Sequence, residues 1–184
     1  MDRTLKKLYR DHAHLLRLTD LLQLQLDELA QTDRPASDLL IELISYIKDY
    51  ADTIHHPIED HLYQIMLART DTGREHMERL LGDHLVIINM TREFRQALEA
   101  LGNNRGISRD EVVKIGREYV EQQREHMQFE ESTAFPLLRE ELGSEDFDYA
   151  KGALPADEDP LLDPNMEARY PGLFRYMGQN KNQP

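Results

Sequence analysis

An internal repeat constrains the fold of this chain of 184 residues more than any other feature of the sequence. Apolar residues with alternating three- and four-residue spacing run through residues 5–29 and again through residues 77–101. Subtracting 72 from each position of the second run returns the first, with His84 on His12. This spacing is typical of helices that bury one face, so the repeat predicts two equivalent amphipathic helices.

The segments that follow these two helices also match, at an offset of 71 residues. His55 and Glu59 correspond to His126 and Glu130. A histidine and a glutamate four residues apart lie on one face of a helix, one turn from each other. The repeat therefore predicts a doubled helix pair, in which each half carries a lone histidine and then a histidine–glutamate pair.

Turn and capping residues separate the four predicted helices. A loop rich in glycine and asparagine ends at Ser108, which has the spacing of a capping box with Glu111. Thr72 and Glu75 have the same spacing before the third helix. Short loops between four long amphipathic helices predict an all-α, antiparallel, up-down-up-down four-helix bundle.

The bundle is expected to span residues 1–143. Residues 144–184, rich in proline and aspartate, are expected to form a short irregular tail that packs on the bundle and frays at its last residues. Pro57 cannot donate a hydrogen bond to the preceding turn, so the second helix should kink beside His55.

Composition restricts the functional classes. The formal net charge of −13 disfavours nucleic acid as a partner, and no apolar run is long enough to span a membrane. The chain has no cysteine, so any metal would need nitrogen and oxygen ligands. Its first residues lack a signal-peptide pattern, and we expect a cytoplasmic protein.

Six ionisable residues on inward-facing seams should meet at one level of the core. They are His12, His55, Glu59, His84, His126 and Glu130. Burying four imidazoles and two carboxylates alone is costly, and a pair of metal ions removes this cost. Bundles that combine carboxylates with histidine at helical spacing are known di-iron and di-manganese frameworks. We therefore predict a two-metal site.

The ligand count leaves room for chemistry at the metals. If each ion takes two histidines and both glutamates bridge, an octahedral ion keeps two positions free of protein ligands. One would hold a bridging oxo or hydroxo group, and the other would be open to a diatomic molecule or peroxide. Iron, manganese and zinc all accept these ligands, and the ligand types alone do not choose among them.

Four segments resemble the hemerythrin-like (HHE cation-binding) domain family, in its bacterial single-domain form: DHAHLLRLTDLL, HHPIEDHLY, LLGDHLVI and REHMQFEESTAFPLL. The resemblance covers residues 5–142. It implies a non-haem di-iron centre, with two iron ions in an Fe–O–Fe arrangement as the expected cofactor and the six residues above as ligands. Members of this family bind dioxygen, respond to nitric oxide or oxidative stress, or handle iron.

The sequence departs from the family pattern in two places. Oxygen-carrying hemerythrins place two histidines four residues apart on the third helix, whereas Leu80 and Ile88 flank His84 at that spacing. The missing nitrogen ligand argues against pure oxygen carriage. The ligand set is instead similar to that of di-iron proteins that repair nitrosatively damaged iron centres, which usually carry a cysteine-containing segment that is absent here.

The remaining histidines have no histidine counterpart in the repeat. We therefore expect His14, His56, His61 and His76 to occupy ordinary core or surface positions. His14 is the substitute ligand if His12 is misassigned.

Five other polar residues, which form two pairs and a single position, each have two interpretations. Asp60 and Glu131 follow the two glutamates and either support the ligands by hydrogen bonds or face solvent. Thr19 and Thr91 are expected to bond the preceding helical turn rather than support the site. Tyr119 either reaches a bound oxygen species or is a core tyrosine whose hydroxyl is satisfied elsewhere.

The functional prediction is binding or sensing of a small oxidant: dioxygen, nitric oxide or peroxide. Two alternatives stay open. One is a di-iron enzyme or iron donor in the repair of nitrosative or oxidative damage, and the other is a module that holds metal only for stability. The sequence does not decide whether the protein turns over a substrate, and it is compatible with a homodimer.

Overall fold

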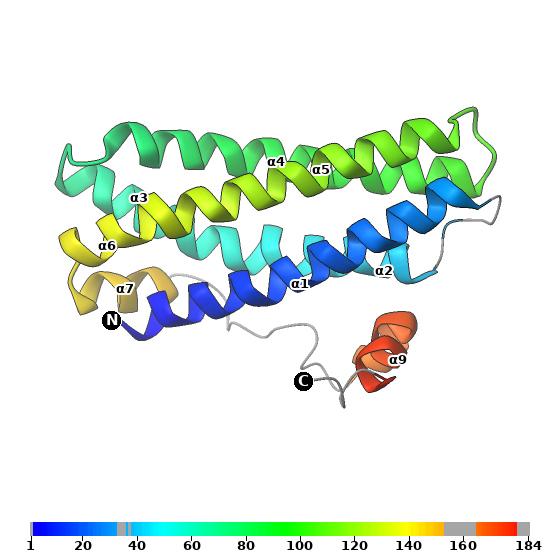
Figure 1. Cartoon of the computed structure of the whole chain (residues 1–184). Coiled ribbons are helices and arrows are strands. Elements are labelled where there is room, and N and C mark those ends of the chain that lie inside the picture. Colours follow the sequence, from blue (N-terminus) through cyan, green and yellow to red (C-terminus); the bar gives the residue numbers. More distant parts are fainter. Residues whose placement is uncertain (1, 33–35, 37, 153–164, 180–184) are drawn as a thin grey trace.

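The computed structural model describes residues 2–32, 36, 38–152 and 165–179. Every regular element in these residues is helical, and the long helices lie side by side (Figure 1). The prediction of an all-α fold is therefore confirmed.

Two helices of 29 residues run without interruption: α1 (Arg3–Gln31) and α4 (Arg74–Gly102). The other two helical stretches are each divided into three segments. They are α2 (Asp38–Ile47), η1 (Lys48–His55) and α3 (His56–Arg69), then α5 (Arg109–Phe129), η2 (Glu130–Ala134) and α6 (Phe135–Glu141). The symbol η denotes a π-helix, in which each N–H bonds the carbonyl five residues earlier.

Each π-helix precedes a proline. Pro57 lies in the first turn of α3, where it has no N–H to donate, and the N–H of His56 bonds the carbonyl of Ala51. Pro136 follows η2 in the same way. At the position of the predicted kink beside His55, the chain thus inserts a π-helical turn.

One of the two predicted capping boxes is present. The Ser108 side chain accepts a hydrogen bond from the N–H of Glu111, whose carboxylate accepts one from the N–H of Ser108. The box predicted at Thr72 and Glu75 is wrong. The residue that precedes α4 is Gly73, whose φ of +68° is in the left-handed region that glycine adopts at little cost.

The C-terminal region is more regular than predicted. It contains α7 (Ser144–Gly152), α8 (Met166–Arg169) and α9 (Pro171–Gln179). The expectation of an irregular tail is therefore wrong for the described residues, because buried apolar residues such as Phe147, Tyr170 and Leu173 give these short helices an inward face. The predicted fraying concerns the last residues, which lie outside the described part.

The C-terminal helices contact the long ones. α7 packs on α1 and α3, and α9 packs on α2. The guanidinium of Arg169 and the hydroxyl of Tyr170 both donate to Asp49 in η1, at 2.6 and 2.7 Å. The N–H of Leu173 donates to the Glu42 carboxylate at 2.8 Å. These contacts hold α8 and α9 against the helical stretch that contains η1.

The core consists of two apolar clusters with polar residues between them. One cluster includes Leu5 and Leu8 of α1 with parts of α3, α6 and α7, and the other begins at Leu15 and continues along α1, α2 and α5. His12 lies between them in the sequence of α1 and is fully buried. Apolar packing therefore surrounds the level of the core where the predicted ligands lie.

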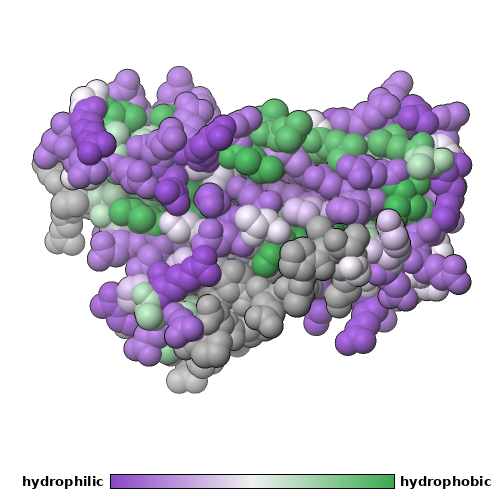
Figure 2. Space-filling model, turned by 180° about the vertical axis from the view of Figure 1, so that it is seen from behind, coloured by the Kyte–Doolittle hydropathy of each residue, from purple (hydrophilic) through white to green (hydrophobic). Residues whose placement is uncertain are grey.

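The surface is mainly hydrophilic. Figure 2 shows hydrophobic side chains in limited patches along the upper part of the face turned away in Figure 1. Leu85 and Val86 of α4 are among the exposed apolar residues. No helix in the described part of the chain has the length and apolar character that crossing a bilayer requires.

Candidate metal centre

The structure brings the six predicted ligands together. His12 comes from α1, His84 from α4 and His126 from α5, while the other three lie at or next to the two π-helices. All six side chains are at most 1% exposed: His12, His55, Glu59, His84, His126 and Glu130. Neither α1 nor α4 could supply this set alone, so the site depends on the packing of all the long helices.

Glu59 faces histidines from both halves of the repeat. Its Oε1 lies 3.3 Å from His12 Nε2 and 3.2 Å from His55 Nε2. Its Oε2 lies 3.6 Å from His84 Nε2. One carboxylate thus reaches nitrogens at both ends of the cluster.

Glu130 has an equivalent position. Its Oε2 lies 3.2 Å from both His12 Nε2 and His126 Nε2, and its Oε1 lies 3.4 Å from His84 Nε2. Two carboxylates that each face several imidazoles have the arrangement that bridging ligands need.

Several of these atoms make no hydrogen bond in spite of the short distances. Both oxygens of Glu59, Oε2 of Glu130 and Nε2 of His12 lack a hydrogen-bond partner and are buried. Such atoms point toward a shared space rather than at one another. Because an uncompensated buried carboxylate costs several kcal/mol, this donor set fits cations held in that space.

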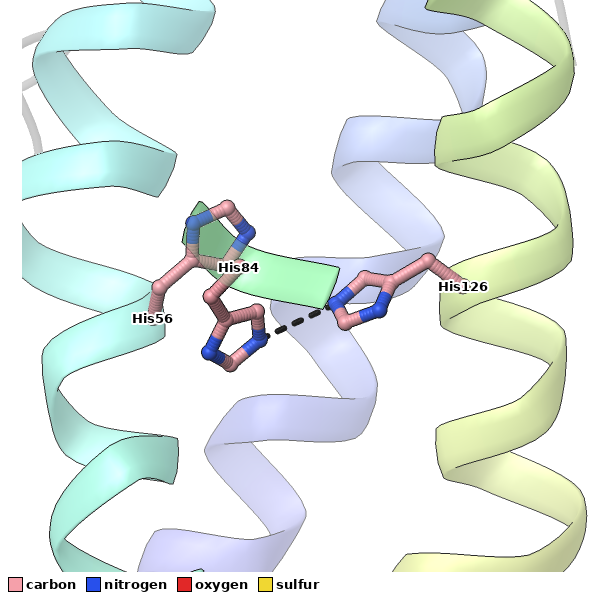
Figure 3. A group of neighbouring side chains, drawn as sticks. All are labelled: His56, His84 and His126. Atoms are coloured by element: carbon pink, nitrogen blue, oxygen red, sulfur yellow. Dashed lines mark hydrogen bonds between the residues drawn. The ribbon is translucent and has the colours of Figure 1, made fainter. Parts of the chain in front are cut away.

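The spacing of the nitrogens agrees with this. His84 Nε2 and His126 Nε2 lie 3.0 Å apart (Figure 3). Two nitrogens bound to one octahedral ion at about 2.1 Å are separated by about 3.0 Å. The pair could therefore bind a single ion with little rearrangement.

Two histidines have a carboxylate beside the ring nitrogen that points away from the centre. In both cases the carboxylate and the histidine come from different halves of the repeat. Asp60 Oδ1 lies 2.6 Å from His84 Nδ1, and Glu131 Oε1 lies 3.2 Å from His12 Nδ1. The supporting role considered for Asp60 and Glu131 is confirmed. Such contacts fix the ring orientation and direct Nε2 toward a metal.

The other two histidines differ from each other. Asp11 Oδ2 lies 3.4 Å from His55 Nδ1. The counterpart of Asp11 in the repeat is Asp83, which instead pairs with Arg79 at 3.3 Å. The Nδ1 atom of His126 is buried without a hydrogen bond. The two halves of the site are therefore not equivalent.

Tyr63 is a site residue that the sequence interpretation missed. Its buried hydroxyl donates to Glu130 Oε1 at 2.7 Å. Tyr63 lies four residues after Glu59, so continuing the histidine–glutamate spacing by one turn would have found it. Glu59 receives no such hydrogen bond.

His56 does not occupy the ordinary position expected of it. It is 3% exposed, and its ring stacks on that of His84 with centroids 4.3 Å apart and planes at 19° (Figure 3). It also meets His126 edge to face, with centroids 5.8 Å apart. A third imidazole thus lies beside the pair that could share an ion.

The other residues considered from the sequence lie apart from this cluster. His14 packs edge-on against Tyr46, His61 Nδ1 lies 2.8 Å from the Pro57 carbonyl, and His76 contacts Phe129. None of these three histidines belongs to a group of potential metal ligands in the described residues.

The hydroxyl-bearing residues behave as core residues. Tyr119 is buried, and its hydroxyl accepts a hydrogen bond from Gln123 at 2.8 Å and lies 3.4 Å from the Thr91 hydroxyl, which favours the core interpretation. The hydroxyls of Thr19 and Thr91 bond the carbonyls of Leu15 and Ile87, so the predicted bond to the preceding turn is confirmed.

Burial and charge shift the pKa values within the site in opposite directions. Burial lowers the pKa of His84, but Asp60 and Glu130 outweigh it and raise that pKa to about 10. Burial lowers the pKa of His126 to about 3. Burial raises the pKa of Glu130, but His126, His12 and His84 hold it well below its usual range. Without metal, protons neutralise this cluster, and bound cations would take their place.

A helical fold with a buried set of histidine and carboxylate ligands defines a cation-binding class of protein. The model of one family, the hemerythrin HHE cation-binding domain, matches residues 3–138. The chain belongs to this family. No curated protein and no solved structure gave a significant match.

Proposed function

We propose that this chain is a non-haem di-iron protein that binds a small oxidant, such as dioxygen, nitric oxide or peroxide. His12, His55, His84 and His126 would hold the two ions, and Glu59 and Glu130 would bridge them. The observation that carries the proposal is Glu59: both of its buried oxygens lack a hydrogen bond in a core with four imidazoles. Two irons would supply redox chemistry and an open coordination position.

The surrounding residues would hold the ligands in place. Asp60, Glu131 and Asp11 orient the rings of three histidines, and Tyr63 restrains Glu130. The apolar clusters on both sides would exclude bulk water. The arrangement of helices supports an antiparallel four-helix bundle, in which each π-containing stretch acts as one long helix.

Metal analysis of protein produced with iron tests this proposal. We expect close to two irons per chain, with near-ultraviolet absorption that bleaches on reduction and returns in air. Zinc without redox-linked absorption would favour a module that holds metal for stability. Catalytic consumption of nitric oxide or peroxide with a reductant would favour the enzyme alternative.

Replacing a bridging carboxylate tests the ligand assignment. Glu59→Gln and Glu130→Gln keep the side-chain volume but remove the charge, so each variant should lose at least one metal per chain. His61→Ala is the matched control on the same helix as Glu59, and its metal content should not change. Two metals retained in both glutamine variants would show that neither glutamate bridges.

A further inference from the structure

A pocket on the surface ends two side chains away from the candidate metal centre. It has a volume of about 450 Å³ and lies between η1, which contributes Lys48, Asp52 and Thr53, and α4, which contributes Ile88, Arg92 and Arg95 among others. The Asp52 side chain is 7% exposed, and its Oδ1 is buried without a hydrogen-bond partner. Asp52 thus forms the floor of the pocket.

His56 lies directly beneath this floor. Its Nδ1 is 3.7 Å from Asp52 Oδ1, and its other face stacks on the His84 ring. The sequence of contacts from the pocket to the centre is therefore Asp52, His56 and then His84 with His126. Two side chains separate the pocket from the proposed ligands.

His56 is badly placed to be a ligand of the ion beside His84. Nitrogens of His56, His84 and His126 come within 4.8 Å of one another. A metal bound to an imidazole nitrogen lies in the plane of that ring, however, and the nearly parallel planes of His56 and His84 do not meet near their nitrogens. His56 is instead placed to contact a small molecule that approaches this ion.

The charges of the pocket indicate which molecules it would attract. Lys48, Arg92 and Arg95 line it together with the carboxylates of Asp52 and Glu99, in a chain whose formal net charge is −13. Arg95 pairs with Glu99 at 3.3 Å and Lys48 lies 3.6 Å from Asp49, whereas Arg92 makes no ion pair with a described residue. Burial raises the pKa of Asp52 to about 7, which reduces the negative charge at the floor. Arg92 is therefore the cation at the opening whose charge is not balanced by an ion pair with a described residue, and such a charge attracts small anions.

We propose that this pocket is the entrance through which a small anion reaches the metal centre, and that His56 is the side chain that contacts the anion there. The proposal rests on the proposed function, since it requires a centre with an open position. The proposed function is thereby extended in three respects: the route by which the ligand enters, the side of the metal centre that it reaches, and its charge.

The test is the rate at which azide, a small linear anion, binds the iron-loaded full-length protein, followed by stopped-flow absorption. Ile88→Trp should fill the pocket and slow association by about tenfold or more, with unchanged iron content. Thr53→Trp blocks the opposite wall and should give the same result. Leu85→Trp is the matched control, because Leu85 is 66% exposed on α4 and does not line the pocket. Association as fast in both blocked variants as in the wild type would overturn the proposed entrance.

Two further variants separate charge from contact. Arg92→Gln should slow azide association by about two- to fivefold and weaken its dependence on salt. His56→Ala should weaken azide binding by about tenfold while two irons are retained. Loss of iron in His56→Ala would make His56 a ligand and overturn its assignment. Iron-loaded wild type that binds no azide would overturn the anion entrance, and nitric oxide, a neutral molecule, tests the proposed function separately on the same sample.

Discussion

The carboxylates that contact the outer ring nitrogens of the histidines determine how firmly each histidine is held in position. Asp60 contacts the outer nitrogen of His84 at 2.6 Å, so Asp60→Asn should lower metal affinity by about 10- to 100-fold. Asp83→Asn is the matched control, because Asp83 pairs with Arg79 and contacts no ligand. Affinity measured by competition with a chelator should separate the two variants. Equal metal affinities in the two variants would show that the Asp60 carboxylate does not help His84 to bind metal.

Asp52 makes the stability of the metal-free protein depend on pH. Burial raises its pKa from 3.8 to about 7. As pH rises from about 4 to about 7, the unfolded chain ionises Asp52 while the folded chain keeps it protonated, so stability is lost across this range. Asp52→Asn removes that loss, and its advantage should grow from none at about pH 4 to on the order of 4 kcal/mol above about pH 7.

Urea unfolding of both metal-free proteins at several pH values measures this difference. Using the difference between variants matters, because other titrating groups face Asp52 and contribute to both curves. They are Lys48 and Asp49 of η1, His56 of α3, and His84 of α4. A stability difference that is constant with pH would show that water reaches Asp52 freely.

The repeat predicted the buried set of six, but it could not reveal His56 or Tyr63. His56 aligns with Met127 and Tyr63 aligns with Ala134, so a method that depends on matching the halves passes over both. His56 is also adjacent to His55, and in an α-helix neighbouring residues point about 100° apart. The π-helix that ends at His55 has more residues per turn, which brings neighbours closer in direction and allows both to be buried.

At the scale of helical elements, the two predicted capping boxes give opposite expectations. Ser108 caps α5 in the structure, so Ser108→Ala should destabilise the protein by about 1 kcal/mol. Thr72→Ala should change stability by less than about 0.5 kcal/mol, because Gly73 and not Thr72 precedes α4. Thermal unfolding of the two variants side by side measures the contrast. A loss at Thr72 as large as that at Ser108 would contradict the observed start of α4.

Interrupted helices explain why the predicted elements were right in type and incomplete in detail. Apolar periodicity continues through a π-helical turn, so the sequence predicts one long helix where the structure has α2, η1 and α3. Pro57 marked the place, since it removes a hydrogen-bond donor from the ladder. A missing donor alone does not distinguish a bend from a π-helical turn, which depends on packing against the other helices.

At the scale of the whole molecule, close helix packing can be tested at glycine. A Cβ at Gly116 would lie 2.6 Å from a terminal methyl of Leu26 and 2.8 Å from the ring of Phe94, two fully buried side chains that would have to move aside. Gly116→Ala should destabilise the protein by about 1–3 kcal/mol.

Gly82→Ala provides the control, since it also replaces a helical glycine but has no atom within 4 Å of the new Cβ. It should stabilise the protein by about 0.5–1 kcal/mol, because alanine loses less backbone entropy in a helix. Chemical denaturation of both variants measures the change in the free energy of unfolding, which should have opposite signs in the two. Stabilisation by Gly116→Ala would show that Leu26 and Phe94 can move aside without cost.

The departures from the repeat also affect how the protein would fill with metal. Identical halves would bind two ions with equal affinity, and partly loaded samples would be mixtures. Asp11 reaches His55 whereas Asp83 does not reach His126, so the histidines of the two halves are not held equally firmly. Unequal sites fill one after the other. A protein with a single ion would then be a distinct species, able to accept or release the second ion while keeping the first.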